Sequence, residues 1–229
     1  MFGEEESMNI KGIDISHWNG NINFNLVKAA GIDFVIIKAG GFESGPYKDS
    51  MFETNYKKAK DAGLNVGAYY FAGKNFKDGL TGTVYAGHFY SLIQGKEFEY
   101  PVFIDVEAQD VRYKDGITDA TVNFCEALEK MGYFVGIYAS DISGYKNRLH
   151  HDKIKNYAHW VARYGSEPAI CKEYQLWQYS SKGSVRGIIG SVDMDISKVD
   201  YTKIMKSKGL NGFKKVKESV LKIRKHKEE

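Results

Sequence analysis

The chain has 229 residues, of which 43% are hydrophobic and 27% charged, which suits one large α/β domain with at most a short appendage. No apolar run approaches the roughly 20 residues that a membrane-spanning helix needs, so stable membrane insertion is not expected. The formal net charge of +3 is concentrated near the C-terminus, because residues 212–229 hold seven Lys or Arg and three Glu. The main domain is therefore close to neutral, and nucleic-acid binding is not expected.

The first residues of the chain and its two cysteines indicate what to expect of export, disulfide bonds and metal binding. Residues 1–6 are acidic and lack an apolar core, so a Sec-type signal peptide is not expected. Cys125 falls within a helical apolar pattern and is interpreted as a small buried hydrophobe, while a bridge to Cys171 stays open. No Cys/His spacing resembles a zinc site, so we expect neither a metal nor a cofactor.

Strand-like and helix-like segments alternate through the first 140 residues. The segment 33–39 (DFVIIKA) is an apolar run, which is typical of a strand covered on both faces. Helical spacing of Phe52, Tyr56 and Ala59 predicts a helix that ends at Gly63. Strands are predicted over 10–16, 33–39, 65–71, 101–107 and 133–140, and the other helices over 24–30, 80–94 and 118–131.

After residue 140 the alternation weakens. Short strands are predicted over 158–163, 174–179 and 191–195, with no clear helix between them. The repeated βα unit favours a parallel sheet or barrel, and a barrel closed by plain strands fits this loss of helices. A doubly wound open sheet is the alternative, although no G-x-G-x-x-G or P-loop lysine motif follows any strand.

Acidic residues lie near the ends of three predicted strands, where the side chains of a catalytic barrel line its active face. The pair Asp105 and Glu107 is the most informative, because residues i and i+2 of a strand point to the same face with Cα atoms roughly 6.5 Å apart. Repulsion and burial would leave one carboxylic acid and one carboxylate, the pairing that glycoside hydrolysis uses. A structural pair, satisfied by backbone N–H groups or Arg, is the alternative.

The other acids are less specific by themselves. Asp14 lies near the end of the first predicted strand and could equally be a helix cap or a buried acceptor for Ser16 or His17. His17 is more often a packed or hydrogen-bonded histidine than a general base. Asp193 and Asp195 lie near the last strand.

Eight segments in this order resemble the signatures of glycoside hydrolase family 25, the Chalaropsis-type lysozymes. They are GIDISHWNG (12–20), AGIDFVIIKA (30–39), AGLNVGAYYF (62–71), PVFIDVE (101–107), GIY (136–138), WVARY (160–164), WQYSS (177–181) and GSVDMD (190–195). Each is short, but their joint occurrence over about residues 9–205 is specific. The resemblance implies an irregular TIM-like β/α barrel with about five βα units and closing strands that lack helices.

The resemblance also assigns residues. It implies Glu107 as the general acid/base, Asp105 as its partner that stabilises the developing cation, and Asp14 and Asp193 as the rest of an acidic cluster. Aromatic residues would line the substrate groove: Tyr69, Tyr138 and Trp177, with Tyr70 and Tyr179 as further candidates. Strand alternation should let only one of Tyr69 and Tyr70 face that groove. The chain departs from the family at Asp195, where Asn is common, and at Arg163, where Gln is common.

The implied reaction is hydrolysis of the β-1,4 bond after N-acetylmuramic acid in bacterial peptidoglycan. The protein would act on the cell wall, outside a cell or released by a phage, and a monomer is expected. The attacking group stays open between water and the substrate's own 2-acetamido group. Two rivals are a barrel that binds peptidoglycan without cutting it, which predicts loss of one or more acids, and a hydrolase that uses the acids to hold Mg²⁺ or Ca²⁺.

The predicted catalytic domain covers 9–207, and 208–229 form a basic C-terminal helix or linker. Phe213, Val216, Val220 and Ile223 make one narrow apolar stripe, which favours a terminal helix docked on the barrel. The alternatives are a basic arm that contacts anionic wall polymers or a membrane surface, and a linker to a wall-binding module.

Overall fold

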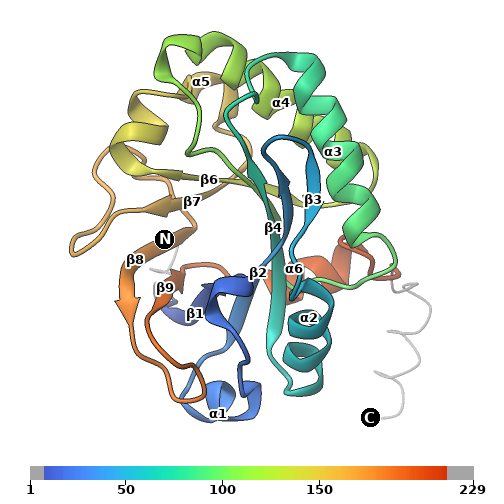
Figure 1. The fold of residues 1–229 in the computed structure, drawn as a ribbon, viewed down its shortest axis with the longest axis vertical. Coiled ribbons are helices and arrows are strands. Elements are labelled where there is room, and N and C mark those ends of the chain that lie inside the picture. The colour runs from blue at the N-terminus through green and yellow to red at the C-terminus, as the bar shows by residue number, and fades with distance from the viewer. Residues whose placement is uncertain (1–7, 216–229) are drawn as a thin grey trace, which may run out of the picture.

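The computed structural model describes residues 8–215, in which eight strands close into a barrel surrounded by helices (Figure 1). The barrel strands are β1 (Ile10–Ile15), β2 (Phe34–Phe42), β4 (Asn65–Ala72), β5 (Val102–Asp105), β6 (Val135–Ser140), β7 (Ala158–Ala162), β8 (Leu176–Gly183) and β9 (Val192–Ser197). Pairing of β1 with β2 closes the ring, and neighbouring barrel strands are parallel except at β9, which runs antiparallel to both β1 and β8. The predicted β/α barrel is confirmed, and the doubly wound alternative is excluded.

Helices follow the early strands and then shorten. The first four are α1 (Phe24–Ala29), α2 (Phe52–Asp61), α3 (Gly79–Ile93) and α4 (Lys114–Lys130). Between β6 and β7 come only a π-helix (Asp141–Lys146) and the four-residue α5 (His151–Ile154). Within the described residues, no helix separates β7, β8 and β9, as the sequence predicts. Two single-turn 3-10 helices lie in the connections after β1 and β5: His17–Asn19 follows β1, and Val111–Tyr113 leads directly into α4.

Two layers of buried apolar side chains stabilise the barrel, one inside it and one beneath the helices, because alternate residues of each strand face opposite sides. Val35 and Ile37 of β2 point outward beneath the helices, whereas Phe34 and Ile36 point into the barrel. All four are fully buried, so this first half of β2 is apolar on both faces. In the view of Figure 1, α3 and α4 lie side by side along the outside of the sheet.

Two elements are additions to the predicted set: β3 (Pro46–Lys48), which forms a hairpin with β2, and α6 (Tyr201–Lys208). Tyr201 of α6 packs with the residues inside the barrel. Fully buried Asn211 accepts a hydrogen bond from the Phe134 N–H (2.7 Å) and donates one to the Tyr100 carbonyl (2.8 Å). The packing therefore continues beyond residue 207, and most of the apolar stripe predicted for the tail lies outside the described residues.

The two cysteines and the lengths of the helices bear on the predictions about a disulfide bond and about membrane insertion. Cys125 and Cys171 are both free and buried, and Cys125 lies on the covered face of α4 as its pattern predicts. Among the described residues, no helix has the length and apolar character that crossing a bilayer requires.

Candidate active site

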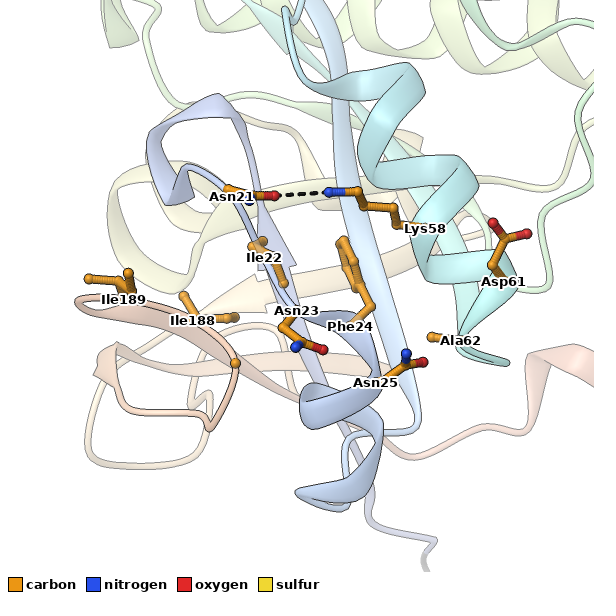
Figure 2. A pocket seen from close by; sticks show the side chains of 11 residues that line it. Asn21, Ile22, Asn23, Phe24, Asn25, Lys58, Asp61, Ala62, Ile188 and Ile189 are labelled. Carbon is orange, nitrogen blue, oxygen red and sulfur yellow. Dashed lines mark hydrogen bonds between the residues drawn. The ribbon is translucent and has the colours of Figure 1, made fainter.

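A pocket of about 200 Å³ opens at the carboxyl end of the parallel strands. Four acids and four aromatic side chains line it together with one amide: Asp14, Asp105, Glu107 and Asp193; Tyr69, Tyr138, Trp160 and Tyr164; and Gln178. The four acids predicted from strand ends are thus brought together. A larger groove of about 670 Å³ lies beside α1 and α2 (Figure 2), but among the described residues Asp61 is the only acid that lines it. There Lys58 donates a hydrogen bond to Asn21, and no pair of acids faces the space.

Strand register explains why the acids meet. Asp14 of β1 and Asp193 of β9 are direct register partners in the antiparallel pair, so their side chains leave the sheet on the same face. Asp105 is the last residue of β5 and lies beside Tyr138 of β6. Glu107 follows two residues later, just past the end of the strand. Asp14 and Asp193 therefore come from the neighbouring strands β1 and β9, and Asp105 and Glu107 come from the end of β5 on the other side of the barrel mouth.

Asp105 and Glu107 form a coupled acid pair with different surroundings. Asp105 is 4% exposed and its Oδ1 has no hydrogen-bond partner, whereas Glu107 is exposed. Burial and then the charge of Glu107 raise the pKa of Asp105 well above its usual value. Partial removal from water also raises the pKa of Glu107. Such a pair retains one proton to higher pH than either carboxyl would alone.

Two cations oppose these upward pKa shifts. Lys38 of β2 places its Nζ 4.7 Å from the centre of the Phe71 ring, and its charge lowers the pKa of both acids. The charge of Arg148 also lowers the pKa of both acids. Its guanidinium also donates hydrogen bonds to the carbonyls of Gln109 (2.8 Å) and Val106 (3.3 Å), which brackets the turn that carries Glu107.

Gln178 links Asp14 to two tyrosines through hydrogen bonds. Its Nε2 donates to Asp14 Oδ2 (2.7 Å), while its Oε1 accepts from the hydroxyls of Tyr138 (2.9 Å) and Tyr164 (3.1 Å). Because both hydroxyls donate to the oxygen, the amide can present only its NH₂ group to Asp14. Gln178 lies within the WQYSS segment but is not among the site residues predicted from the sequence.

The predicted aromatic residues divide between the two faces of their strands. Tyr69 and Tyr138 line the pocket. Tyr70 does not, and its prediction as a groove residue was wrong: it is fully buried under α3, where its hydroxyl donates to the Gly41 carbonyl (3.0 Å). Trp177 and Tyr179 flank inward-facing Gln178 and lie outside the pocket lining, with Trp177 Nε1 donating to the Arg163 carbonyl (2.7 Å). Strand alternation accounts for all of these placements.

Comparison with known proteins agrees with this geometry. The sequence model of Glycosyl hydrolases family 25 matches residues 13–188. The chain belongs to this family. The autolytic lysozyme of Clostridium acetobutylicum is 37% identical over 187 residues, which cover 81% of this chain and 55% of that protein. The chain therefore spans about half the length of this curated relative.

Two solved endolysin structures share the fold. The CTP1L endolysin superposes with a TM-score of 0.75 and 32% identity, covering 86% of this chain and 69% of that one. The catalytic domain of the endolysin ply40, from bacteriophage P40 of Listeria monocytogenes, superposes with a TM-score of 0.73 and 29% identity. That match covers 89% of this chain and 99% of the ply40 domain.

Asp195, the main departure from the family 25 pattern, lies at the floor of the acid cluster and not in solvent. It is fully buried, and its Oδ1 accepts a hydrogen bond from Trp160 Nε1 (2.8 Å). Its Oδ2 has no N–H or O–H donor, and its near neighbour is the carboxyl of Asp14. Burial raises the pKa of Asp195 to about 8, and burial followed by the charges of Asp195 and Asp193 raises that of Asp14. One proton shared by Asp14 and Asp195 satisfies both carboxyls.

Arg163 and His17 have structural partners. Arg163 Nη1 lies 2.6 Å from Asp141 Oδ2, and buried Asp141 also accepts hydrogen bonds from the backbone N–H groups of residues 169–171. This cluster fixes the loop between β7 and β8. His17 Nδ1 lies 2.7 Å from Asp49 Oδ2, so His17 is the hydrogen-bonded histidine that the sequence favoured. The residue that caps the turn after β1 is Ser16, which leaves Asp14 free to face the pocket.

Proposed function

We propose that this protein is a peptidoglycan hydrolase of the N-acetylmuramidase type, which cleaves the β-1,4 bond between N-acetylmuramic acid and N-acetylglucosamine. The observation that carries the proposal is the pairing of exposed Glu107 with buried Asp105 in a pocket that two further acids share. Membership of family 25 and the similarity to an autolytic lysozyme and two endolysins support bacterial cell wall as the substrate.

Glu107 is proposed as the general acid because it is the pair's exposed member and can reach a glycosidic oxygen in the groove. A bound sugar would exclude water from Glu107 and raise its pKa further, which holds the pair's proton where the leaving oxygen needs it. As positive charge develops at the anomeric carbon, the remaining carboxylate character of Asp105, Asp14 and Asp193 would stabilise it.

Asp105 also bears on which group attacks the anomeric carbon. Its Oδ1 is buried in the pocket wall and has no hydrogen-bond partner. A free acceptor at that place suits the N–H of the 2-acetamido group, which becomes nucleophilic at its carbonyl oxygen when that N–H is held. We therefore favour substrate-assisted cleavage, followed by attack of water that Glu107 activates.

Mass spectrometry of digested peptidoglycan tests the bond that is cut. Products should carry N-acetylmuramic acid at the new reducing end, and the digestion should continue in the presence of a chelator. N-acetylglucosamine at the new reducing end would overturn the muramidase assignment, and complete inhibition by a chelator would favour a metal-dependent hydrolase. Protein in which Glu107 is replaced by Gln is the matched control for contaminating wall hydrolases.

A further inference from the structure

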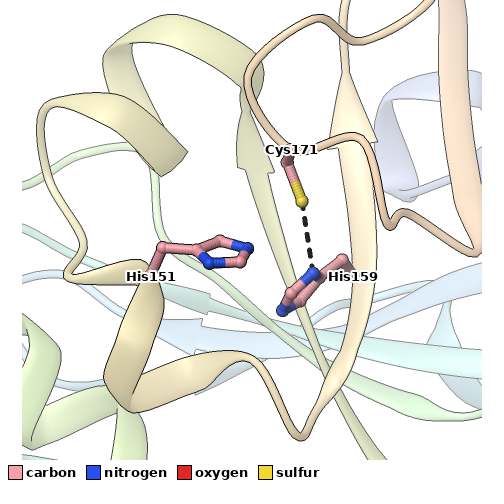
Figure 3. Close-up of side chains that lie close together, drawn as sticks. All are labelled: His151, His159 and Cys171. Carbon is pink, nitrogen blue, oxygen red and sulfur yellow. Dashed lines mark hydrogen bonds between the residues drawn. The ribbon is translucent and has the colours of Figure 1, made fainter.

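Three side chains of metal-ligating type converge on the outer side of the barrel, away from the acid pocket (Figure 3). They come from three elements: His151 from α5, His159 from β7 and Cys171 from the loop between β7 and β8. One ligand atom from each lies within 4.8 Å of the other two. His159 and the pocket residue Trp160 are neighbours on β7, so they face opposite sides of the barrel wall.

The hydrogen bonds of His159 leave a lone pair directed at the cysteine. Its Nε2 lies 3.1 Å from the carbonyl oxygen of Ile154, which can only accept, so Nε2 carries the hydrogen. Its Nδ1 is then unprotonated and lies 3.2 Å from Cys171 Sγ. Metal-bound histidines are commonly oriented in this way, with the second ring nitrogen donating to a backbone carbonyl.

The surroundings hold two of the ligands in place and leave the third accessible. His159 and Cys171 are buried, and the Cys171 N–H donates to Asp141 Oδ1 (3.0 Å). The Tyr145 ring packs against His159 with the ring centres 5.2 Å apart. His151 is exposed, and its ring centre lies 5.5 Å from that of His159. A cation can therefore approach from the side of His151 without opening the core.

We propose that His151, the Nδ1 of His159 and the Sγ of Cys171 bind a zinc ion, with water as the fourth ligand. Usual zinc bond lengths and tetrahedral angles require ligand atoms roughly 3.4–3.6 Å apart, close to the sulfur–nitrogen distance found here. A small rotation of exposed His151 brings in the third ligand. Two imidazoles and a thiolate form a donor set suited to zinc. Binding converts the thiol to a thiolate, and its proton leaves to solvent.

Such an ion would tie α5, β7 and the β7–β8 loop together. That loop begins at Arg163 and Tyr164, and the Tyr164 hydroxyl belongs to the hydrogen-bond network of Gln178 in the pocket. The ion lies outside the proposed catalytic machinery, so its expected role is to stabilise this part of the barrel. Removing it should lower the stability of the folded protein without abolishing cleavage.

Titration of the reduced, metal-free protein with Co²⁺ tests the site, because thiolate coordination of cobalt produces a charge-transfer absorption band in the near ultraviolet. We expect the band to saturate at one ion per chain, and Zn²⁺ to displace the cobalt and remove the band. Cys171→Ser should abolish it, and His151→Gln should weaken cobalt binding at least tenfold. His151 is exposed, so the second variant should fold normally and keeps the test decisive if the first does not fold.

Two matched controls separate this site from adventitious binding. Cys125→Ser changes the other buried cysteine, and His150→Gln changes a neighbouring histidine that pairs with Asp115, 2.6 Å away. Both variants should keep the band. A folded wild-type protein without a charge-transfer band, or an unchanged cobalt affinity in His151→Gln, would overturn the proposal. Wall cleavage in the presence of a chelator is scored separately, so failure of the zinc site and failure of the proposed activity give different results.

Discussion

Replacing Asp195 with Asn should make the barrel more stable near neutral pH and flatten the dependence of its stability on pH. Asp195 is fully buried, and its pKa is raised from the usual 3.8 to about 8. Asn has nearly the same shape. Its Oδ1 can still accept from Trp160 Nε1, and its Nδ2 can donate to the Asp14 carboxyl, which becomes free to ionise.

The sign and size follow from proton linkage. Between pH 3.8 and about 8, the folded protein holds a proton on Asp195 that the unfolded chain has lost. The stabilisation from this proton is complete below pH 3.8 and is lost progressively as the pH rises to about 8. At about 1.36 kcal/mol per pH unit, the loss by pH 7 reaches roughly 4 kcal/mol, an upper limit for the gain from Asn. Because the proton is shared with Asp14, the two acids contribute to this change together.

Urea unfolding of both proteins at several pH values between about 5 and 8 measures this effect. The difference in unfolding free energy between variant and wild type should grow with pH, at equal m-values. Asp110→Asn is the matched control, because exposed Asp110 pairs with Arg112 and its pKa is lowered to about 2, outside the tested range. Parallel curves for Asp195→Asn and wild type, or a variant less stable at every pH, would refute the buried-proton argument.

The remaining predictions concern the acid pair and the corrected tyrosine. Glu107→Gln should lower the rate of wall cleavage by ~10²–10⁴-fold with no loss of stability, and full activity would contradict its role as general acid. Lys38→Met removes a charge that lowers the pKa values of Asp105 and Glu107, so the alkaline limb of the pH profile of kcat/KM should move to higher pH. The control Lys153→Met changes a lysine of an exposed ion pair and should leave the alkaline limb in place. Tyr70→Phe leaves the Gly41 carbonyl without this hydrogen-bond donor. The free energy of unfolding in urea should fall by about 1–2 kcal/mol, while the rate of wall cleavage stays unchanged. A lower cleavage rate at unchanged stability would instead indicate that Tyr70 lines the substrate groove.

The sequence was sufficient for the barrel strands because their signals are local. Apolar runs such as 33–39 mark a strand buried on both faces whatever surrounds it, and all eight predicted barrel strands occur. The short hairpin strand β3 and helix α6 were missed, because β3 has three residues and α6 owes its place to packing of Tyr201 inside the barrel. Asn211 likewise shows no local pattern, since its partners lie at residues 100 and 134.

At the candidate site, the sequence predicted which strands contribute but not always which face. Acids at strand ends were expected to meet, and the pocket contains all four. Alternation allowed one of Tyr69 and Tyr70 to face inward without saying which. On β8, inward-facing Gln178 lines the pocket and Trp177 and Tyr179 lie outside its lining, so their place along the substrate groove stays a prediction. Lys38 influences the acid pair across strands, a tertiary effect that a single sequence does not display.

The floor of the pocket connects stability to chemistry. Trp160 packs against Phe103 and Tyr138 inside the barrel, with ring centres 5.1 and 4.5 Å away, and its Nε1 holds Asp195. The same apolar layer therefore supports the barrel and excludes water from the acids above it. Exclusion of water is the largest cause of the raised pKa at Asp14 and Asp105. A more polar floor would lower those pKa values and remove the retained protons, so the cost of burying these acids is inseparable from the acid–base chemistry proposed for the site.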